Sequence, residues 1–187
     1  MNFRALTLAA MLSVSALSGA AFAQDNPMVG GAAMFADKNI VENAVNSADH
    51  TTLVAAVQAA GLVETLSGEG PFTVLAPVNA AFDALPEGAV ETLLKPENKE
   101  MLSTILACHV IPAKALSTDI VGMVEADGGE HVVDTVGGCK LTLKAADGKV
   151  TVTDENGTVA NVTIADVIQS NGVIHVIDAV LTPKSAM

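Results

Sequence analysis

The chain has 187 residues, a formal net charge of −12 at pH 7 and a composition that is 50% hydrophobic. This length suits one domain with a sizeable buried core, and the acidic balance excludes nucleic acid as a partner because it repels phosphate backbones. Trp and Tyr are absent, so we expect no site that stacks its ligand on aromatic rings of these types.

Residues 1–23 have the order of a Sec signal peptide. A basic start at Arg4 precedes an apolar run from Ala5 to about Leu17, and small residues follow at Ala21 and Ala23. The apolar run is shorter than the roughly 20 residues that a membrane-spanning helix needs. We therefore expect cleavage after Ala23, no membrane insertion of the mature chain, and a periplasmic or extracellular location. A retained N-terminal anchor is the alternative.

The first half of the mature chain has a helical pattern. We expect residues 24–36 to be a flexible leader, and beyond it apolar residues recur every three to four positions. Asp49 is expected to cap a helix over residues 51–60 that stops at Gly61. The other elements expected here are a helix over 39–45, a turn over 62–66, a strand over 72–77, and helices that begin near Asn79, Pro86 and Glu97.

The second half is rich in strands. After a short strand over residues 108–111 and a helix and turn over 113–125, the apolar period is mostly two. Hairpin turns are expected at Asp147-Gly148 and Asn156-Gly157. The expected strands cover residues 131–136, 141–144, 150–153, 159–168 and 173–180. A helical first half joined to a β-rich second half predicts an α+β domain.

Two segments are more distinctive than the rest. Residues 72–82, FTVLAPVNAAF, are a buried strand, a Pro stop and a helix that Asn79 would cap; residues 171–183, NGVIHVIDAVLTP, are a turn and an apolar strand that ends at Pro. The residues that give the two segments their character are Phe72, Pro77, Asn79, Phe82, His175 and Asp178.

These segments resemble the two signature boxes of the fasciclin domain family, in the same order and about 100 residues apart. The resemblance covers residues 37–184, and implies a twisted β-wedge or sandwich with helices packed along one side. It also implies adhesion to a cell-surface or matrix protein. In animal members a tyrosine–histidine pair has been linked to integrin binding, and here Cys108 and His109 occupy that place. These two residues are therefore the candidate binding residues.

The residues that could carry chemistry have structural explanations. Neighbouring residues on a strand point to opposite faces, so Cys108 and His109 are not expected to act as a nucleophile and its base. His175 is expected to be a satisfied core or edge histidine and not a ligand. Asp178 is expected to be a fold-defining carboxylate, which, where buried, would need partners such as backbone N–H groups. His50 and His131 are expected at the surface. We expect no catalytic residue, metal site or cofactor.

Cys108 and Cys139 are the two cysteines of the chain. In an oxidising compartment they form either a disulfide or two buried free thiols, and the sequence leaves both alternatives open. Without CxxC spacing they do not predict a zinc site. The sequence favours an exported adhesion module without catalysis. The alternative is a periplasmic carrier that holds a small, lipid-like ligand in an apolar groove.

Overall fold

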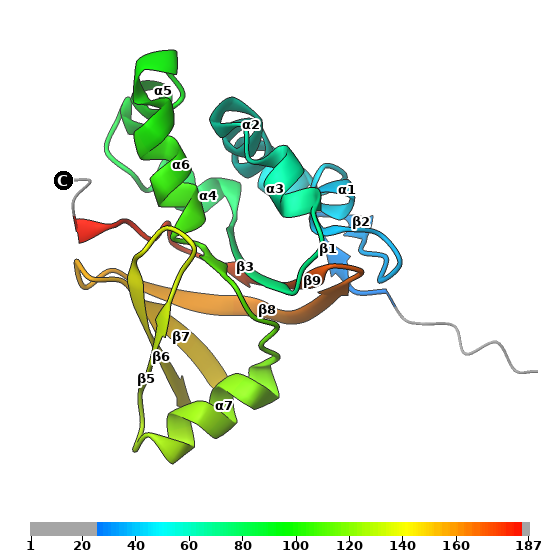
Figure 1. The fold of residues 1–187 in the computed structure, drawn as a ribbon, viewed down its shortest axis with the longest axis vertical. Helices are drawn as coiled ribbons and strands as arrows, with labels where there is room; N and C mark the ends of the chain where they lie inside the picture. Colours follow the sequence, from blue (N-terminus) through cyan, green and yellow to red (C-terminus); the bar gives the residue numbers. More distant parts are fainter. Residues whose placement is uncertain (1–25, 185–187) are drawn as a thin grey trace, which may run out of the picture.

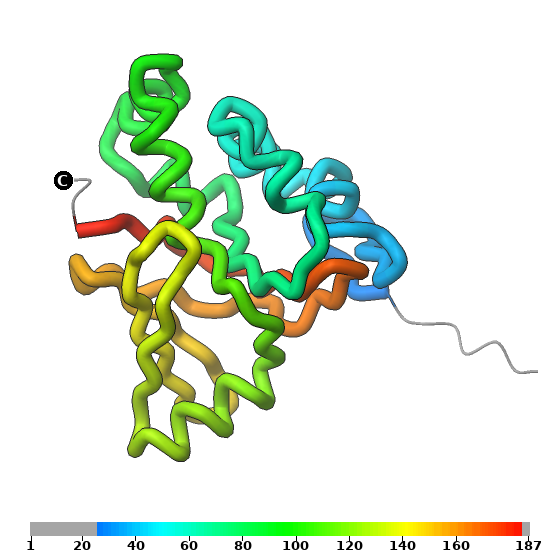
Figure 2. Tube along the Cα trace, viewed as in Figure 1, coloured from blue at the N-terminus to red at the C-terminus, as the bar shows by residue number. Residues whose placement is uncertain are grey.

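A sheet of seven strands, with most of the helices on one side of it, forms the centre of the molecule (Figure 1). The structure is a computed structural model that describes residues 26–184. The strand order is β4-β3-β9-β8-β7-β6-β5. Figure 2 shows the last strand passing through the middle of the molecule, between the helices and the remaining strands. The α+β prediction, with helices along one side, is confirmed.

The helical side contains the elements that the 3.6-residue apolar period indicates. Helix α2 (Thr51–Ala60) has the predicted bounds, and Gly61 ends it with a φ of 76°, which glycine adopts without steric cost. The other elements of this side are α1 (Ile40–Ala44), the 3₁₀ turn η1 (Ala48–His50), α3 (Val63–Ser67), α4 (Asn79–Asp83), α5 (Ala89–Leu93), the 3₁₀ turn η2 (Pro96–Asn98) and α6 (Lys99–Ala107).

The N-terminal part of the described chain is folded onto this side. Strands β1 (Met28–Val29) and β2 (Ala32–Ala33) pair as a hairpin. Val29 and Met34 are buried in the core that the helices form. We expected a flexible leader over 24–36, whereas residues 28–34 gain enough apolar burial to be held in place.

The two signature segments form neighbouring parallel strands. Strand β3 (Phe72–Pro77) pairs with β9 (Gly172–Ile177) along its whole length. All six residues of β9 are buried, as expected for parallel strands that are covered on both faces. Gly172 is required for the close approach, because a Cβ there would lie 2.1 Å from the carbonyl oxygen of Phe72.

Strand β3 separates two apolar cores. Its residues alternate between the faces: Val74 and Ala76 face the core under the helices, whereas Leu75 faces a second core. The second core lies between α7 (Ser117–Ala126) and the curled strands. These strands are β5 (His131–Asp134), β6 (Lys140–Ala146), β7 (Lys149–Thr153) and β8 (Val159–Gln169).

The sheet curls until its two ends meet. Strand β4 (Val110–Ile111) is at one end of the strand order, and the residues after β5 lie beside it. The N–H of Val136 donates to the carbonyl of Val110 at 2.8 Å, and the N–H of Gly137 donates to that of Ala107 at 3.0 Å. A disulfide between Cys108 and Cys139 crosses the same junction. Of the two alternatives for these cysteines, the structure has the disulfide.

Candidate binding site

Cys108 and His109, the candidate binding residues, lie between α6 and β4. Cys108 follows the last residue of α6 with helical backbone angles, and the strand begins only at Val110. The predicted strand over 108–111 is therefore two residues too long, and the argument from opposite strand faces does not apply. A Cys–His dyad is absent for another reason, because the sulfur of Cys108 is bonded to Cys139.

Both ring nitrogens of His109 form hydrogen bonds inside the molecule. Nδ1 donates to the carbonyl of Ile105 at 2.8 Å, and Nε2 accepts the N–H of Leu181 at 2.9 Å. Burial lowers the pKa of His109 to about 4, against smaller opposing effects of the Ile105 carbonyl and the Asp154 carboxylate. His109 is therefore a neutral link between α6 and the C-terminal segment. Cys108 and His109 are 1% and 2% exposed, so neither side chain reaches the surface.

His175 makes a matching link from β9. Nε2 donates to the carbonyl of Ala115 at 2.9 Å, and Nδ1 accepts the N–H of Asp166 at 3.2 Å. Burial lowers the pKa of His175, although the Ala115 carbonyl and the Asp166 carboxylate oppose this effect. The expectation of a core histidine agrees with these contacts.

Asn79 caps a helix, but not the one that the sequence indicates. Its Oδ1 accepts the N–H of Thr52 at 3.0 Å, and its Nδ2 donates to the carbonyl of Ala48 at 2.8 Å. The first contact caps α2 and the second holds the 3₁₀ turn before it, whereas α4 has no side-chain cap. Asp49 lies within the 3₁₀ turn before α2 and does not cap it, so both cap predictions were wrong.

The other signature residues have structural positions. Phe82 is buried in the core under the helices, Pro77 is buried at the end of β3, and Phe72 is half-buried. Asp178 is exposed, but it accepts the backbone N–H of Asn161 at 2.7 Å and the side-chain Nδ2 of Asn161 at 2.8 Å. The predicted backbone contact of Asp178 is present.

Two aspartates that the sequence reasoning missed hold distant segments together. Asp154 accepts the N–H of Thr158 at 2.8 Å through one oxygen and that of Thr182 at 2.9 Å through the other. Asp166 accepts the N–H of Ser117, the first residue of α7, at 2.6 Å. Thr182 is 28 residues from Asp154, and Ser117 is 49 residues from Asp166, so local sequence patterns carry no signal for these two contacts.

His50 is buried and not at the surface as expected. It is 3% exposed, and its Nδ1 lies 2.8 Å from Oγ of Ser47. Its Nε2 is the one buried side-chain nitrogen or oxygen among residues 26–184 that has no hydrogen-bond partner. His50 lines an apolar cavity of about 50 Å³ that lies between helices α1–α3 and strands β3 and β9.

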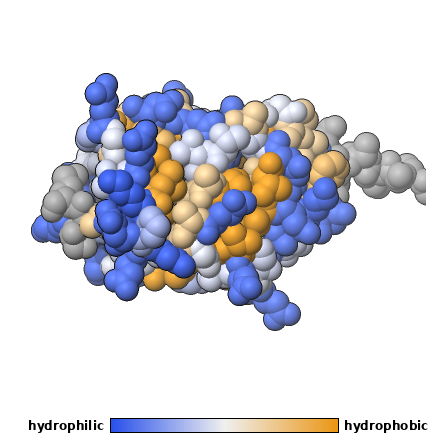
Figure 3. Space-filling view, turned by 90° about the horizontal axis from the view of Figure 1, so that it is seen from above, coloured by the Kyte–Doolittle hydropathy of each residue, from blue (hydrophilic) through white to orange (hydrophobic). Residues whose placement is uncertain are grey.

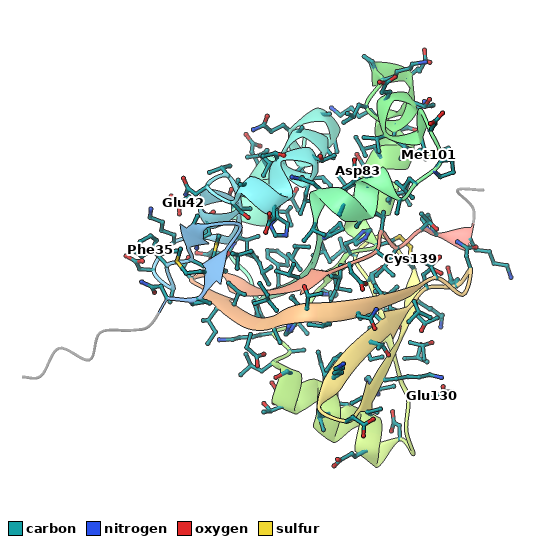
Figure 4. All side chains as sticks on the ribbon, turned by 180° about the vertical axis from the view of Figure 1, so that it is seen from behind. Phe35, Glu42, Asp83, Met101, Glu130 and Cys139 are labelled. Atoms are coloured by element: carbon teal, nitrogen blue, oxygen red, sulfur yellow. A yellow bond between two sulfur atoms is a disulfide. The ribbon has the colours of Figure 1, made fainter. Side chains whose placement is uncertain are left out.

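Apolar side chains reach the surface at the tip formed by α5 and α6. No residue of α5 is buried, and Val90 and Leu93 of this helix and Leu94 after it are half-buried. Met101 on α6 is 43% exposed. In Figure 3, which looks down on the helices, apolar side chains lie between hydrophilic ones. Figure 4 shows Met101 and Asp83 at this end of the molecule. We call Val90, Leu93, Leu94 and Met101 the tip residues.

The described residues provide no group of three or more His, Cys, Asp or Glu side chains that could hold a metal ion. Within residues 26–184 there is also no helix that is long and apolar enough to cross a membrane. The signal-peptide prediction falls on residues 1–23, which lie outside the described part of the chain.

Comparison with known proteins gives a consistent result. A family model described as "Fasciclin domain" matches residues 48–183. The chain is 49% identical over 160 residues to Protein sll1483 of Synechocystis sp. The aligned residues are 86% of this chain and 82% of that protein. It is 31% identical over 147 residues to the Immunogenic protein MPB70 of Mycobacterium bovis, covering 76% of this chain and 67% of that protein.

A longer animal protein and a solved structure are also similar. The Transforming growth factor-beta-induced protein ig-h3 of Sus scrofa is 40% identical over 133 residues, which are 71% of this chain but 17% of that protein. The structure of a FAS1 domain pair from the insect cell adhesion molecule Fasciclin I superposes with a TM-score of 0.70 at 17% identity, over 80% of this chain and 52% of that chain. At this identity, the superposition shows a shared fold.

Proposed function

Because this chain belongs to the fasciclin domain family, we propose that it is an exported adhesion module that binds a cell-surface or matrix protein through its outer surface and catalyses no reaction. The similar insect protein is described as a cell adhesion molecule. The signature segments of this chain build the centre of the domain as β3 and β9. The surface around them is therefore the part left to contact a partner.

One observation carries this proposal. The cysteine and the two histidines that could otherwise react already form bonds within the protein. Cys108 is in a disulfide, and His109 and His175 each use both ring nitrogens in hydrogen bonds to the backbone. A nucleophile or general base needs a free position within reach of a substrate. We propose that Cys108 and His109 serve binding indirectly, by fixing the junction between α6 and the curled sheet.

We place the contact surface at the tip residues. Exposed carboxylates occur in the same stretch of the chain as the tip residues, at Asp83, Glu87, Glu91, Glu97 and Glu100, together with the exposed lysines Lys95 and Lys99. Apolar anchors within a charged rim are typical of protein interfaces. The excess of carboxylates favours a partner with a basic surface, because complementary charge promotes association.

An attachment assay tests this function. We expect the mature chain, coated on a surface, to retain cells of its native host, and deletion of the protein to reduce attachment of those cells. Met101→Lys should weaken retention about fivefold or more if Met101 is an anchor. Val132→Lys is the matched control, since Val132 is 53% exposed on β5, away from the tip. The proposal would be contradicted if cell attachment stayed the same both after deletion of the protein and after its addition.

Export is part of the same proposal, and it rests on the order of charged, apolar and small residues in residues 1–23. The intact mass of protein collected from the periplasm or the medium should correspond to a chain that starts at Gln24. Protein that keeps Met1 and sediments with membranes would instead support the retained anchor.

The carrier alternative is not proposed. Pockets that enclose a drug-sized ligand are typically about 300–1,000 Å³, whereas the apolar cavity beside His50 is about 50 Å³. A lipid-like molecule could not be enclosed there as a whole, so carriage of such a molecule is not the main function that we propose.

A further inference from the structure

The apolar cavity has one polar group that nothing in the protein satisfies. Nε2 of His50 has no hydrogen-bond partner in the described residues, although the ring is 3% exposed. The carbonyl of Ala76 is near enough to favour the charged ring, but it does not complete a hydrogen bond to Nε2. A buried group left in this state is destabilising, so a ligand that pairs with it would gain affinity.

The outer part of the cavity lining is apolar and partly exposed. Val41, Ala44, Val54 and Val63, from helices α1, α2 and α3, line it and are half-buried. We call these four residues the rim. Deeper, the lining includes buried residues of β3 and β9 such as Val74 and Ile174. The cavity therefore runs from a partly exposed apolar rim towards the sheet.

A lone water molecule does not suit this environment. Buried waters typically make about three hydrogen bonds. Beside His50 a water would meet Nε2 and the Ala76 carbonyl, and the lining is otherwise mostly hydrocarbon. A ligand that carries its own hydrocarbon and a single polar atom matches the lining better.

The polar atom must be able to pair with either form of the neutral ring. Ser47 Oγ and His50 Nδ1 are 2.8 Å apart, and the tautomer decides which of them donates. Nε2 then carries a proton in one tautomer and a free lone pair in the other. A hydroxyl group can accept in the first case and donate in the second, so an alcohol pairs with both.

A charged ligand is disfavoured. Burial lowers the pKa of His50, so the ring offers no positive charge to a carboxylate. Glu42 and Glu64, which follow the rim residues Val41 and Val63 in the chain, are exposed carboxylates that repel anions. An apolar cavity also gives no compensation for burying a charge.

The cavity also limits the size of the buried part. Its volume is about 50 Å³, and a cavity that holds a single water needs at least about 10–15 Å³. A hydroxyl and a few carbon atoms therefore fit beside His50, while a longer hydrocarbon would extend along the rim. A branched or ring-bearing end would not enter.

We propose that this cavity binds the hydroxyl end of a slender, uncharged primary alcohol, with the hydroxyl hydrogen-bonded to His50 Nε2 and the hydrocarbon against the rim. This site is separate from the tip residues to which we assign adhesion. It adds a small-molecule site to the proposed adhesion function and does not depend on it.

Titration of the mature chain with 1-hexanol, hexane and hexanoate, followed by NMR of its methyl groups, tests the proposal. We expect 1-hexanol to shift saturably the methyl signals of Val54, Val57 and Val74, which line the cavity, and the ring signals of His50 with them. Hexane should bind about tenfold more weakly, since it lacks one neutral hydrogen bond. Hexanoate should cause no saturable shift.

Two variants and a control distinguish the contribution of the His50 ring to ligand binding from that of the cavity shape. His50→Phe keeps a ring of similar size, so its preference for 1-hexanol over hexane should fall from about tenfold to none. Ala44→Leu retains His50 but narrows the rim, and should weaken both ligands. His131→Phe, on β5, is the control and should change neither. Equal binding of 1-hexanol and hexane by the unmodified chain, or no saturable shift with 1-hexanol, would overturn the proposal. Neither result bears on the attachment assay.

Discussion

At the scale of single residues, the buried histidines connect segments that are far apart in the chain. His109 joins α6 to the backbone of Leu181, and His175 joins β9 to the backbone of Ala115 and Asp166. Each ring donates from one nitrogen and accepts at the other. A second proton would occupy the accepting nitrogen and break that hydrogen bond, so both links require the neutral ring.

This requirement makes stability depend on pH. The pKa of His109 is lowered from 6.5 to about 4 by burial, so between these values the unfolded chain binds a proton that the folded chain does not. The contribution of the neutral ring is fully present above pH 6.5 and is lost as the pH falls towards 4. From His109 alone, we expect the free energy of unfolding to decrease by about 2 kcal/mol between pH 7 and pH 5.

Urea denaturation at several pH values measures this decrease. In His109→Gln the side chain cannot titrate, so stability should fall less steeply with pH than in the unmodified chain, even if the variant is less stable at pH 7. His131→Gln, on β5, is the control and should retain the steep decrease, because His109 is unchanged in it. The same slope in His109→Gln and the unmodified chain would show that His109 does not titrate in this way.

At the scale of helices and strands, the start of α2 shows what a local pattern can and cannot predict. The bounds Thr51–Ala60 follow from the apolar period and from Gly61. The cap does not follow, because Asn79 supplies it from 27 residues away. Asp49 is a residue type that often caps helices and it lies just before α2. However, it is within the 3₁₀ turn Ala48–His50 and not at the cap position.

Substitution of the two candidate caps distinguishes them. Asn79→Ala removes the acceptor of the Thr52 N–H and the donor to the Ala48 carbonyl, and should lower the free energy of unfolding by about 1 kcal/mol. Asp49→Ala is the control and should have an effect below about 0.5 kcal/mol. Chemical denaturation measures both. A larger loss for Asp49→Ala than for Asn79→Ala would reverse the assignment.

Other features could not be predicted from the sequence because they also depend on contacts between distant segments. The resemblance of residues 72–82 and 171–183 to a known family was sufficient to predict the fold, because these segments build its central strand pair. Burial of His50 depends on how α1, α2 and β3 come together, and burial of Val29 and Met34 depends on the core that receives them. Neither arrangement leaves a periodic signal in the chain.

At the scale of the whole molecule, one junction joins the helical side to the curled sheet. Cys108 lies at the end of α6 and Cys139 just before β6, so their disulfide connects the two sides. Gly137 allows the approach, because a Cβ there would lie 2.7 Å from the backbone nitrogen of Cys108. The hydrogen bonds of Val136 and Gly137 support the same contact.

Removal of this disulfide should destabilise the molecule without changing its fold. The bridge closes a loop with a sequence separation of 31, and such a loop corresponds to about 3–4 kcal/mol on the chain-entropy model. We expect Cys108→Ser/Cys139→Ser to lose about this free energy of unfolding, while the backbone hydrogen bonds at the junction keep the sheet curled. Denaturation with and without reductant provides the comparison, since reduced unmodified protein should match the double variant. A thiol assay on denatured, unreduced protein is the direct check, and two free thiols per chain would contradict the bridge.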